Sequence, residues 1–214
     1  MRKIILALPK GRILEDLKPF FKKINLEIES EFFNENSRKL IFSTSLDFLD
    51  VVKVRSFDVA TFVRFGGADL GVCGLDVIKE FSSPQILNIL DLGIGKCRLS
   101  LAGKGVEDFD IVKKWQEKSH LRIATKYPKI ANKYFAELGV QTEIIKLNGS
   151  IEIAVKLNLC DYILDLVSSG KTLQENNMTE VKTIFEVSSY LVVNRNSIKT
   201  NNTIINQVIN IFDV

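Results

Sequence analysis

The chain has 214 residues, of which 46% are apolar and 26% are charged. This composition is typical of a globular protein with a substantial core, built as one large domain or two small ones. The formal net charge is only +3, from 29 basic and 26 acidic residues, so nucleic acid is not expected to be the main partner. The charge balance still allows a local basic site that binds small anions.

Cysteine and histidine usage excludes several classes of site. The three cysteines, Cys73, Cys97 and Cys160, are far apart and form no Cys-x-x-Cys pair. This pattern favours reduced thiols in the cytoplasm and argues against a zinc site. His120 is the only histidine, so a histidine-centred catalytic triad is not expected. The first apolar run, residues 4–8, is too short for a signal-peptide core or a membrane span.

The first half of the chain alternates short apolar strands with amphipathic helices. A buried strand is predicted over residues 3–8, followed by a helix whose apolar residues from Ile13 to Ile24 repeat at helical spacing. The next predicted elements are strands at residues 39–43, 59–63 and 69–74 and a helix from about Asp76. This alternation indicates an α/β fold with a mainly parallel sheet.

The α/β pattern restarts near residue 96. The predicted strands cover residues 98–102, 121–125, 142–146, 162–167 and 187–193, and the predicted helices cover 108–118, 130–138, 151–157 and 203–212. We therefore expect two α/β lobes joined by extended crossings, with a cleft between them. Lobe I is predicted to contain residues 1–95 and 188–214, and lobe II residues 96–187. Ligands of such sheets usually bind at the carboxyl ends of the strands.

The most informative segment is an apolar strand with two acids, Asp161 and Asp165, followed by a loop of small hydroxyl residues. The loop contains Ser168, Ser169, Gly170, Lys171 and Thr172. Small residues allow main-chain N–H groups to converge on a phosphate, and the acids suit ribose hydroxyls or magnesium. The same residues also fit a plain surface turn after a buried strand. The second glycine of a nucleotide-triphosphate loop is missing.

Two basic clusters occur in the predicted first lobe. Lys10 and Arg12 flank Gly11 where a strand leads into a helix, and a helix N-terminus favours anions. Arg38 and Lys39 form a second basic pair just before a predicted strand. Either cluster could equally be a solvated turn or strand end, so neither is specific alone.

Two glycine-containing segments allow two interpretations each. Residues 66–76 are rich in small residues, which indicates either close approach of a ligand or tight packing of a strand on a helix. Residues 147–152 join a turn to a helix start, where Ser150 is the predicted N-cap. Residues 148–150 could also line the cleft.

Six segments together resemble the ATP phosphoribosyltransferase family, which carries out the first step of histidine biosynthesis. They are residues 6–12, 37–40, 67–76, 122–128, 147–152 and 165–173. The last of these is similar to the family's phosphoribosyl-pyrophosphate loop and is the most specific. The resemblance runs in register from the first strand to about Asn194. It implies the two-lobed architecture of type II periplasmic binding proteins.

The chain length resembles that of the family's short form, which lacks the C-terminal domain that binds histidine in long enzymes. The resemblance implies a homodimer of catalytic subunits. It also implies a hetero-octamer with a separate regulatory subunit that resembles histidyl-tRNA synthetase.

The resemblance implies a glycosyl transfer without a covalent nucleophile. Adenine N1 of ATP attacks C1 of phosphoribosyl pyrophosphate, which releases pyrophosphate and gives 1-(5-phosphoribosyl)-ATP. Such a reaction needs alignment of two large anions and stabilisation of charge on the leaving group.

The roles implied for individual residues follow this chemistry. The loop from Ser168 to Thr172 would bind the 5-phosphate of the donor. Asp161 and Asp165 would lie by the ribose hydroxyls, directly or through Mg²⁺, which is mainly bound by the substrate. In the first lobe, Arg12, Arg38 and Lys10 would contact the triphosphate and the leaving pyrophosphate, and Cys97 would lie near the nucleotide.

Three other classes of protein share part of this pattern. Solute-binding proteins have the same two-lobed architecture but are expected to carry a secretion signal. Purine-salvage phosphoribosyltransferases usually place two adjacent acids before the phosphate loop, whereas Asp161 and Asp165 are four residues apart. A regulatory ligand-binding module would be expected to have a helix-turn-helix or a linker.

Overall fold

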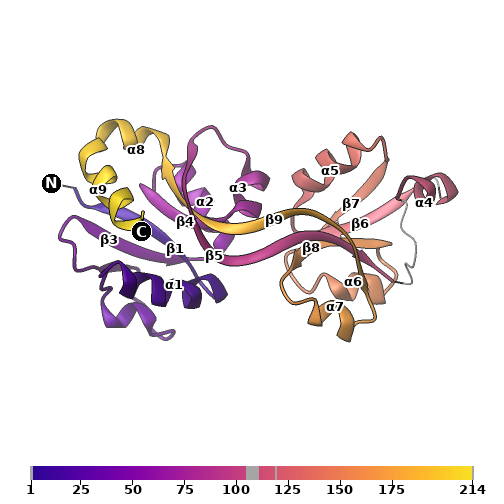
Figure 1. Ribbon diagram of the computed structural model, residues 1–214, viewed down its shortest axis with the longest axis horizontal. Helices are drawn as coiled ribbons and strands as arrows, with labels where there is room; N and C mark the ends of the chain where they lie inside the picture. Colours follow the sequence, from indigo (N-terminus) through magenta and orange to yellow (C-terminus); the bar gives the residue numbers. More distant parts are fainter. Residues whose placement is uncertain (1, 105–110, 119, 214) are drawn as a thin grey trace. The chain divides into compact units, whose positions relative to one another are not determined.

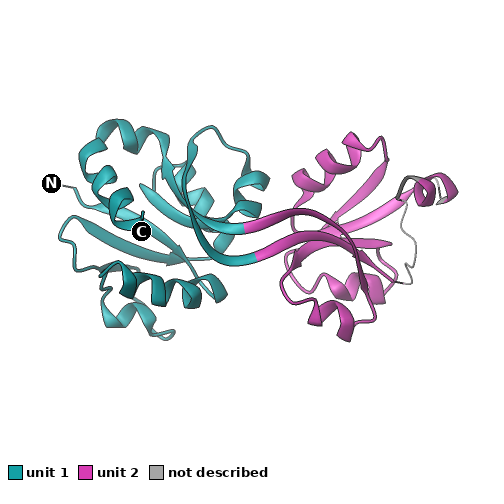
Figure 2. Ribbon diagram, in the orientation of Figure 1, with its two compact units in different colours: residues 1–96, 188–214 teal, residues 97–187 magenta. Residues whose placement is uncertain are grey.

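The computed structural model describes residues 2–104, 111–118 and 120–213 (Figure 1). The chain divides into two compact units (Figure 2). Unit 1 contains residues 1–96 and 188–214, and unit 2 contains residues 97–187. The chain passes between the units twice, within β5 (Ile86–Gly103) and within β9 (Thr179–Asn194).

The sheet of unit 1 is built around β1 (Ile4–Pro9), which pairs in parallel with β3 (Leu49–Val54) and β4 (Leu70–Gly74). The short strand β2 (Ile41–Ser43) pairs with β3 in the antiparallel direction. The last part of β9 pairs antiparallel with β4. The strand order is therefore β2-β3-β1-β4-β9.

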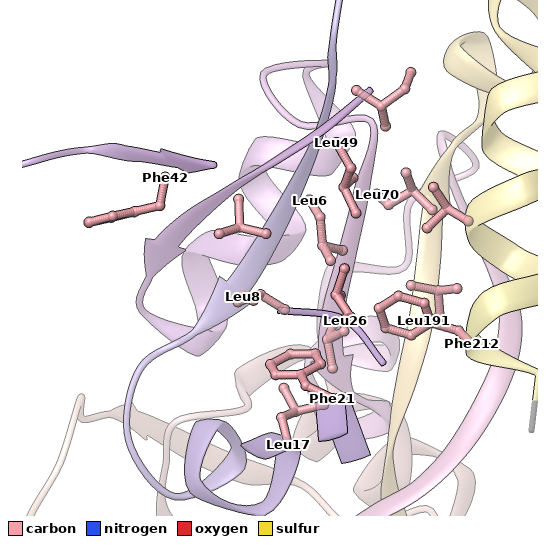
Figure 3. Packing of buried hydrophobic residues seen from close by; sticks show 14 of the residues in the cluster. Leu6, Leu8, Leu17, Phe21, Leu26, Phe42, Leu49, Leu70, Leu191 and Phe212 are labelled. Atoms are coloured by element: carbon pink, nitrogen blue, oxygen red, sulfur yellow. The ribbon is translucent and has the colours of Figure 1, made fainter. Parts of the chain in front are cut away.

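Helices cover both faces of this sheet. They are α1 (Arg12–Lys23), α2 (Ser56–Arg64), α3 (Leu75–Phe81), α8 (Arg195–Thr200) and α9 (Asn202–Phe212), with a 3₁₀ helix at Ser30–Phe33. On one face, Leu6 and Leu8 pack in a cluster with Leu17 of α1 and Phe212 of α9 (Figure 3). On the other face, Ala7 packs in a cluster with α2 and α3. Strands buried on both faces have nearly continuous apolar sequences, which explains why β1 could be predicted.

Unit 2 repeats the same plan on a smaller scale. Its central strand β6 (Leu121–Thr125) pairs in parallel with β7 (Thr142–Lys146) and β8 (Tyr162–Val167), and β5 pairs antiparallel with β8. The helices are α4 (Ile111–Lys118), α5 (Pro128–Glu137), α6 (Glu152–Lys156) and α7 (Lys171–Glu175). The predicted α/β class with mainly parallel central strands is confirmed. Among the residues described, no helix has the length and apolarity needed to cross a bilayer.

In unit 1, one predicted strand is wrong and one strand was missed. Residues 59–63 were expected to form a strand, but they lie in α2. Val59, Ala60 and Val63 are its buried residues, at a spacing of one and four residues that is typical of a helix face. The strand β3 was not predicted, because Asp50 and Lys53 interrupt its apolar sequence.

Further differences concern the ends of elements. β5 and β9 extend well beyond the predicted strands at 98–102 and 187–193. Ser150 is not an N-cap: it has a positive φ of 51°, and helix α6 begins only at Glu152 without a side-chain cap. Residues 108–110 of the predicted helix 108–118 lie outside the described residues.

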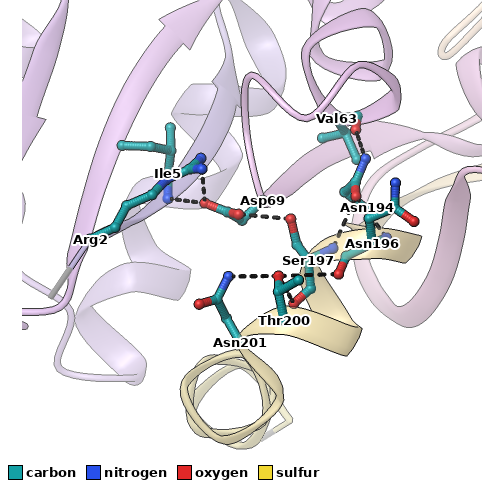
Figure 4. A network of polar contacts seen from close by, with 9 residues as sticks. All are labelled: Arg2, Ile5, Val63, Asp69, Asn194, Asn196, Ser197, Thr200 and Asn201. Atoms are coloured by element: carbon teal, nitrogen blue, oxygen red, sulfur yellow. Dashed lines mark hydrogen bonds and ion pairs between the residues drawn. The ribbon is translucent and has the colours of Figure 1, made fainter.

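A buried polar network fixes the returning chain in unit 1 (Figure 4). The carboxylate of Asp69 accepts hydrogen bonds from Ile5 N at 2.9 Å and from Ser197 Oγ at 2.7 Å. The side chain of Asn194 donates to Val63 O at 2.6 Å and accepts from Ser197 N at 3.0 Å. These contacts join α8 to β1, α2 and the start of β4. Because buried polar groups need such partners, the network specifies where the last helices pack.

Gly71 allows β4 to pack closely against α2. A Cβ atom on Gly71 would lie 2.6 Å from Val59 Cγ1 and 2.8 Å from Val63 Cγ2. Of the two interpretations of the glycine-rich segment, tight packing of strand on helix therefore holds at this residue.

We expect Gly71→Ala to lower the free energy of unfolding by about 1–3 kcal/mol, because the added methyl group overfills the core. Urea denaturation measures this change. Gly149→Ala is the matched control, since a Cβ there meets nothing within 4 Å, and its effect should be about 0.5 kcal/mol or less. Equal stability of the two variants would contradict the packing role.

Candidate functional site

Three helices of unit 1 begin at one edge of its sheet. The parallel strands β1, β3 and β4 each lead directly into a helix: α1, α2 and α3 respectively. The N-cap residues are Gly11, Arg55 and Gly74, and none of them makes a side-chain cap hydrogen bond. First-turn N–H groups and the helix dipole attract anions. This edge, the carboxyl edge of unit 1, therefore suits a ligand with several negative charges.

Two of the predicted cations flank the turn between β1 and α1. Lys10, Gly11 and Arg12 are all exposed. Gly11 has φ 85° and ψ −148°, a conformation open essentially to glycine alone. The main chain of Lys10 donates to Val54 O at 2.7 Å, which ties the turn to the end of β3. The turn thus holds both cations at the carboxyl edge.

Arg38 lies at the same edge, because β2 runs antiparallel to β3. Ile41 at the start of β2 pairs with Val52 near the end of β3, and exposed Arg38 precedes it by three residues. Lys39, in contrast, forms an ion pair with Glu29 at 2.6 Å. The second basic cluster therefore divides into one cation at the edge and one engaged in a structural contact.

Arg55 is a candidate that sequence reasoning missed. It follows β3 directly as the N-cap of α2 and is exposed. The preceding Val54 pairs with Pro9 and accepts the main-chain hydrogen bond of Lys10, so Arg55 and Lys10 follow neighbouring strand ends. The position of Arg55 at a strand end could not be seen in the sequence, because β3 was not recognised as a strand.

The loop of unit 2 is shorter than predicted. β8 ends at Val167, and Gly170 adopts the left-handed conformation with φ 76° as the N-cap of α7. Lys171 and Thr172 are the first two residues of that helix, and the N–H of Lys171 points to Ser169 Oγ at 3.5 Å. Exposed hydroxyls and first-turn N–H groups therefore lie next to one another, as binding of a phosphate requires.

Asp161 and Asp165 do not lie together, because only Asp165 is part of β8. Asp165 is on the strand near the loop, and its Oδ1 accepts from Leu166 N at 2.8 Å. Asp161 precedes the strand, and its Oδ2 accepts from Arg122 N at 2.9 Å. At about 3.3 Å per residue, Asp161 is about 13 Å from Asp165 and about 23 Å from Ser168. Asp165 therefore lies close to the loop, whereas Asp161 joins the amino ends of β8 and β6.

The carboxyl ends of β6 and β7 lie at the same edge of the sheet as the loop after β8. β6 and β7 are parallel to β8 and to each other, so their carboxyl ends lie at the same edge. Thr125 Oγ1 donates to Leu164 O at 2.7 Å and accepts from Tyr127 N at 2.9 Å, which fixes the turn after β6. Residues 148–150 follow β7 and are exposed.

The remaining predicted residues concern thiols and metal. Cys97 is the first residue of unit 2 and is partly buried on β5. None of the three cysteines, all of which lie among the described residues, forms a disulfide, and burial raises the pKa of the Cys73 and Cys160 thiols. Within residues 2–104, 111–118 and 120–213, no group of three or more His, Cys, Asp or Glu side chains is arranged to hold a metal ion.

Solved structures with low identity show the shared fold. The chain matches a substrate-binding protein of an amino acid ABC transporter with a TM-score of 0.57 and 11% identity, over 98% of this chain and 91% of that chain. This similarity establishes the binding-protein fold of two α/β lobes and no activity.

Several relatives share much more of the sequence. The sequence model of ATP phosphoribosyltransferase matches residues 55–213. The ATP phosphoribosyltransferase of Rhodospirillum rubrum is 52% identical over 198 residues, which cover 92% of this chain and 86% of the relative. That of Paramagnetospirillum magneticum is 50% identical, with 92% and 90% covered. The ATP phosphoribosyl transferase (HisG:HisZ) complex from Thermotoga maritima matches with a TM-score of 0.80 and 29% identity, over 98% of this chain and 96% of that chain. The chain therefore belongs to the ATP phosphoribosyltransferase family.

Proposed function

We propose that the chain is a catalytic subunit that joins N1 of ATP to C1 of phosphoribosyl pyrophosphate. The products are 1-(5-phosphoribosyl)-ATP and pyrophosphate, and the reaction is the first step of histidine biosynthesis. The observation that carries the proposal is the strand, turn and helix from Asp165 to Leu173. In a member of this family, that segment has the geometry of a phosphate-binding loop.

Unit 2 binds the ribosyl donor in this proposal. The N–H groups and hydroxyls of Ser168, Ser169 and Thr172 surround the 5-phosphate, and Lys171 adds positive charge. Asp165 lies three residues before the loop on β8, so its carboxylate accepts hydrogen bonds from the ribose hydroxyls.

The carboxyl edge of unit 1 binds the triphosphate and the leaving pyrophosphate. Arg12, Arg38 and Arg55 offer planar guanidinium groups that match phosphate oxygens in pairs, and Lys10 adds a point charge. Negative charge increases on the pyrophosphate as the C1–O bond breaks, so these cations stabilise the transition state more than the ground state. Cys97 would lie near the nucleotide.

The reaction needs no covalent nucleophile and no histidine base. Adenine N1 attacks as a neutral nucleophile, so the enzyme contributes chiefly alignment and charge stabilisation. The exposed position of His120, beside Glu143 on the surface, is consistent with a role outside catalysis.

Magnesium enters the proposal as part of the substrate. The described residues do not form a protein-built metal site, and Asp161 is engaged with Arg122 at the amino end of β6. Mg²⁺ prefers phosphate oxygens and keeps several waters, so it would arrive on the pyrophosphate of the donor and reduce its charge. Asp165, three residues before Ser168 on β8, is the carboxylate closest in the sequence to the loop that would bind the donor.

The similarity to the HisG:HisZ complex supports a regulatory partner. We assign the chain the role of the HisG-type subunit, as a homodimer that assembles with a subunit resembling histidyl-tRNA synthetase into a hetero-octamer. Three cysteines that form no disulfide support a reducing compartment, so we place the reaction in the cytoplasm.

The purified chain, mixed with ATP, phosphoribosyl pyrophosphate, Mg²⁺ and a pyrophosphatase, should produce the ultraviolet absorbance of an N1-substituted adenine. Pyrophosphatase removes one product and so draws the reaction forward. The control omits the ribosyl donor. A solute-binding protein with the same fold would bind a ligand without forming product, so no signal even with the regulatory subunit added would refute the function.

Asp165→Asn and Asp161→Asn should have different effects. Loss of the charged acceptor at Asp165 should raise the donor KM or lower kcat by about 10-fold or more, with little change in Tm. Asp161→Asn should lower Tm, because it weakens the contact with Arg122, while donor KM changes by less than about 3-fold. Steady-state kinetics and thermal unfolding measure both effects. A larger change in donor KM for Asp161→Asn than for Asp165→Asn would contradict the assignment of the ribose hydroxyls to Asp165.

Arg12→Ala and Arg55→Ala should each lower kcat/KM about 100-fold, because each removes a cation that faces the developing pyrophosphate charge. Lys39→Ala is the matched control: it removes an exposed cation from the same unit that is paired with Glu29. Its turnover should stay within about 2-fold of the unmodified chain. Near-normal turnover in both arginine variants would remove the carboxyl edge of unit 1 from the mechanism.

A further inference from the structure

Arg98 contacts Ser168, the first residue of the proposed phosphate loop. It lies on β5 opposite Val167, the last residue of β8. Its NH1 group donates to the main-chain oxygen of Ser168 at 3.2 Å. The contact links residues 70 positions apart in the sequence, so neither residue signals it locally.

The guanidinium group is itself held in place by Glu180 of β9. Arg98 Nε donates to Glu180 Oε1 at 2.6 Å, and its NH2 group donates to Oε2, which makes a bidentate pair. Glu180 Oε1 also accepts from Ser100 Oγ at 2.7 Å and from Thr183 Oγ1 at 3.1 Å. Hydrogen bonding from Arg98 lowers the pKa of Glu180 to about 2, so the pair stays charged at neutral pH.

The contact with Arg98 fixes the orientation of the peptide group between Ser168 and Ser169. The carbonyl of Ser168 and the N–H of Ser169 belong to one planar trans peptide and point in opposite directions. A side chain that fixes the carbonyl therefore also fixes the direction of the N–H, which points away from Arg98. We propose that Arg98, held by Glu180, is a positioning residue that aims the Ser169 N–H at the 5-phosphate of the donor. The proposal rests on the function proposed above.

A different role for Arg98 would be simple attraction of the phosphate by its charge. The two roles predict opposite effects of Glu180→Gln. If Arg98 positions the loop, loss of the carboxylate loosens Arg98 and weakens donor binding. If Arg98 acts as a charge, loss of the neighbouring negative charge strengthens donor binding.

The experiment uses the complete chain with its regulatory subunit and compares Arg98→Met, Glu180→Gln and the double variant. Both single variants should raise the donor KM about 10-fold and leave the ATP KM within about 3-fold. The double variant should be no worse than Arg98→Met alone, because both substitutions remove the same support. Lys133→Gln, which breaks an exposed ion pair with Glu137 in the same unit, is the control and should change neither KM.

Two outcomes would overturn the proposal. A lower donor KM in Glu180→Gln would assign Arg98 the role of a charge. A loss of Tm with equal changes in both KM values would make the ion pair a purely structural contact.

Binding of ribose 5-phosphate, measured by calorimetry, separates this proposal from the proposed function. If the unmodified chain forms no product but binds ribose 5-phosphate, and Arg98→Met weakens that binding about 10-fold, the function fails and the positioning role stands. If product forms and Arg98→Met binds ribose 5-phosphate normally, the function stands and the positioning role fails. If the unmodified chain neither forms product nor binds ribose 5-phosphate, both proposals fail.

Discussion

Strand direction is the constraint on which the candidate site depends. In both units, parallel strands lead directly into helices, so their final residues, the turns and the first helical N–H groups gather at one edge of the sheet. Asp161 and Asp165 show how strict this constraint is. They are only four residues apart in the sequence, yet only Asp165 lies on β8, the strand that leads into the proposed phosphate loop. A carboxylate can bind ribose hydroxyls in such a site only if it lies near the carboxyl end of its strand.

Sequence patterns predicted the elements that are buried on both faces. β1, β4 and β8 are short apolar runs, and such runs occur where helices cover a parallel sheet on both sides. The same reasoning failed for residues 59–63. Their apolar composition indicates a strand, but the spacing of their buried residues is that of a helix, and they lie in α2. β3 was missed because of its charged residues, and Arg55 at its end was missed with it.

Contacts between distant residues could not be predicted from one sequence. The patterns placed Arg38 and Lys39 together as a basic pair, but only the antiparallel return of β2 and the Glu29 contact show that their environments differ. The sequence around Gly71 does not show whether a ligand or a neighbouring helix lies close to this glycine. The methyl groups of Val59 and Val63 show that it is the helix. In each case the deciding partner is supplied by tertiary packing, which local propensity does not encode.

In the proposed reaction, the two units would offer their negatively charged ligands different kinds of partner. Unit 1 offers exposed side-chain cations around helix N-termini, a flexible arrangement that suits a long triphosphate. Unit 2 offers mainly main-chain N–H groups and hydroxyls, whose direction is set by the peptide planes of a short turn. A transfer that depends on alignment is sensitive to displacements of about 1 Å. In the proposed reaction, the turn that binds the ribosyl donor therefore has to be rigid, since C1 of the ribosyl group is where bonds break and form. The hydrogen bond from Arg98 to the Ser168 carbonyl, with Arg98 held by Glu180, would give the turn between β8 and α7 that rigidity.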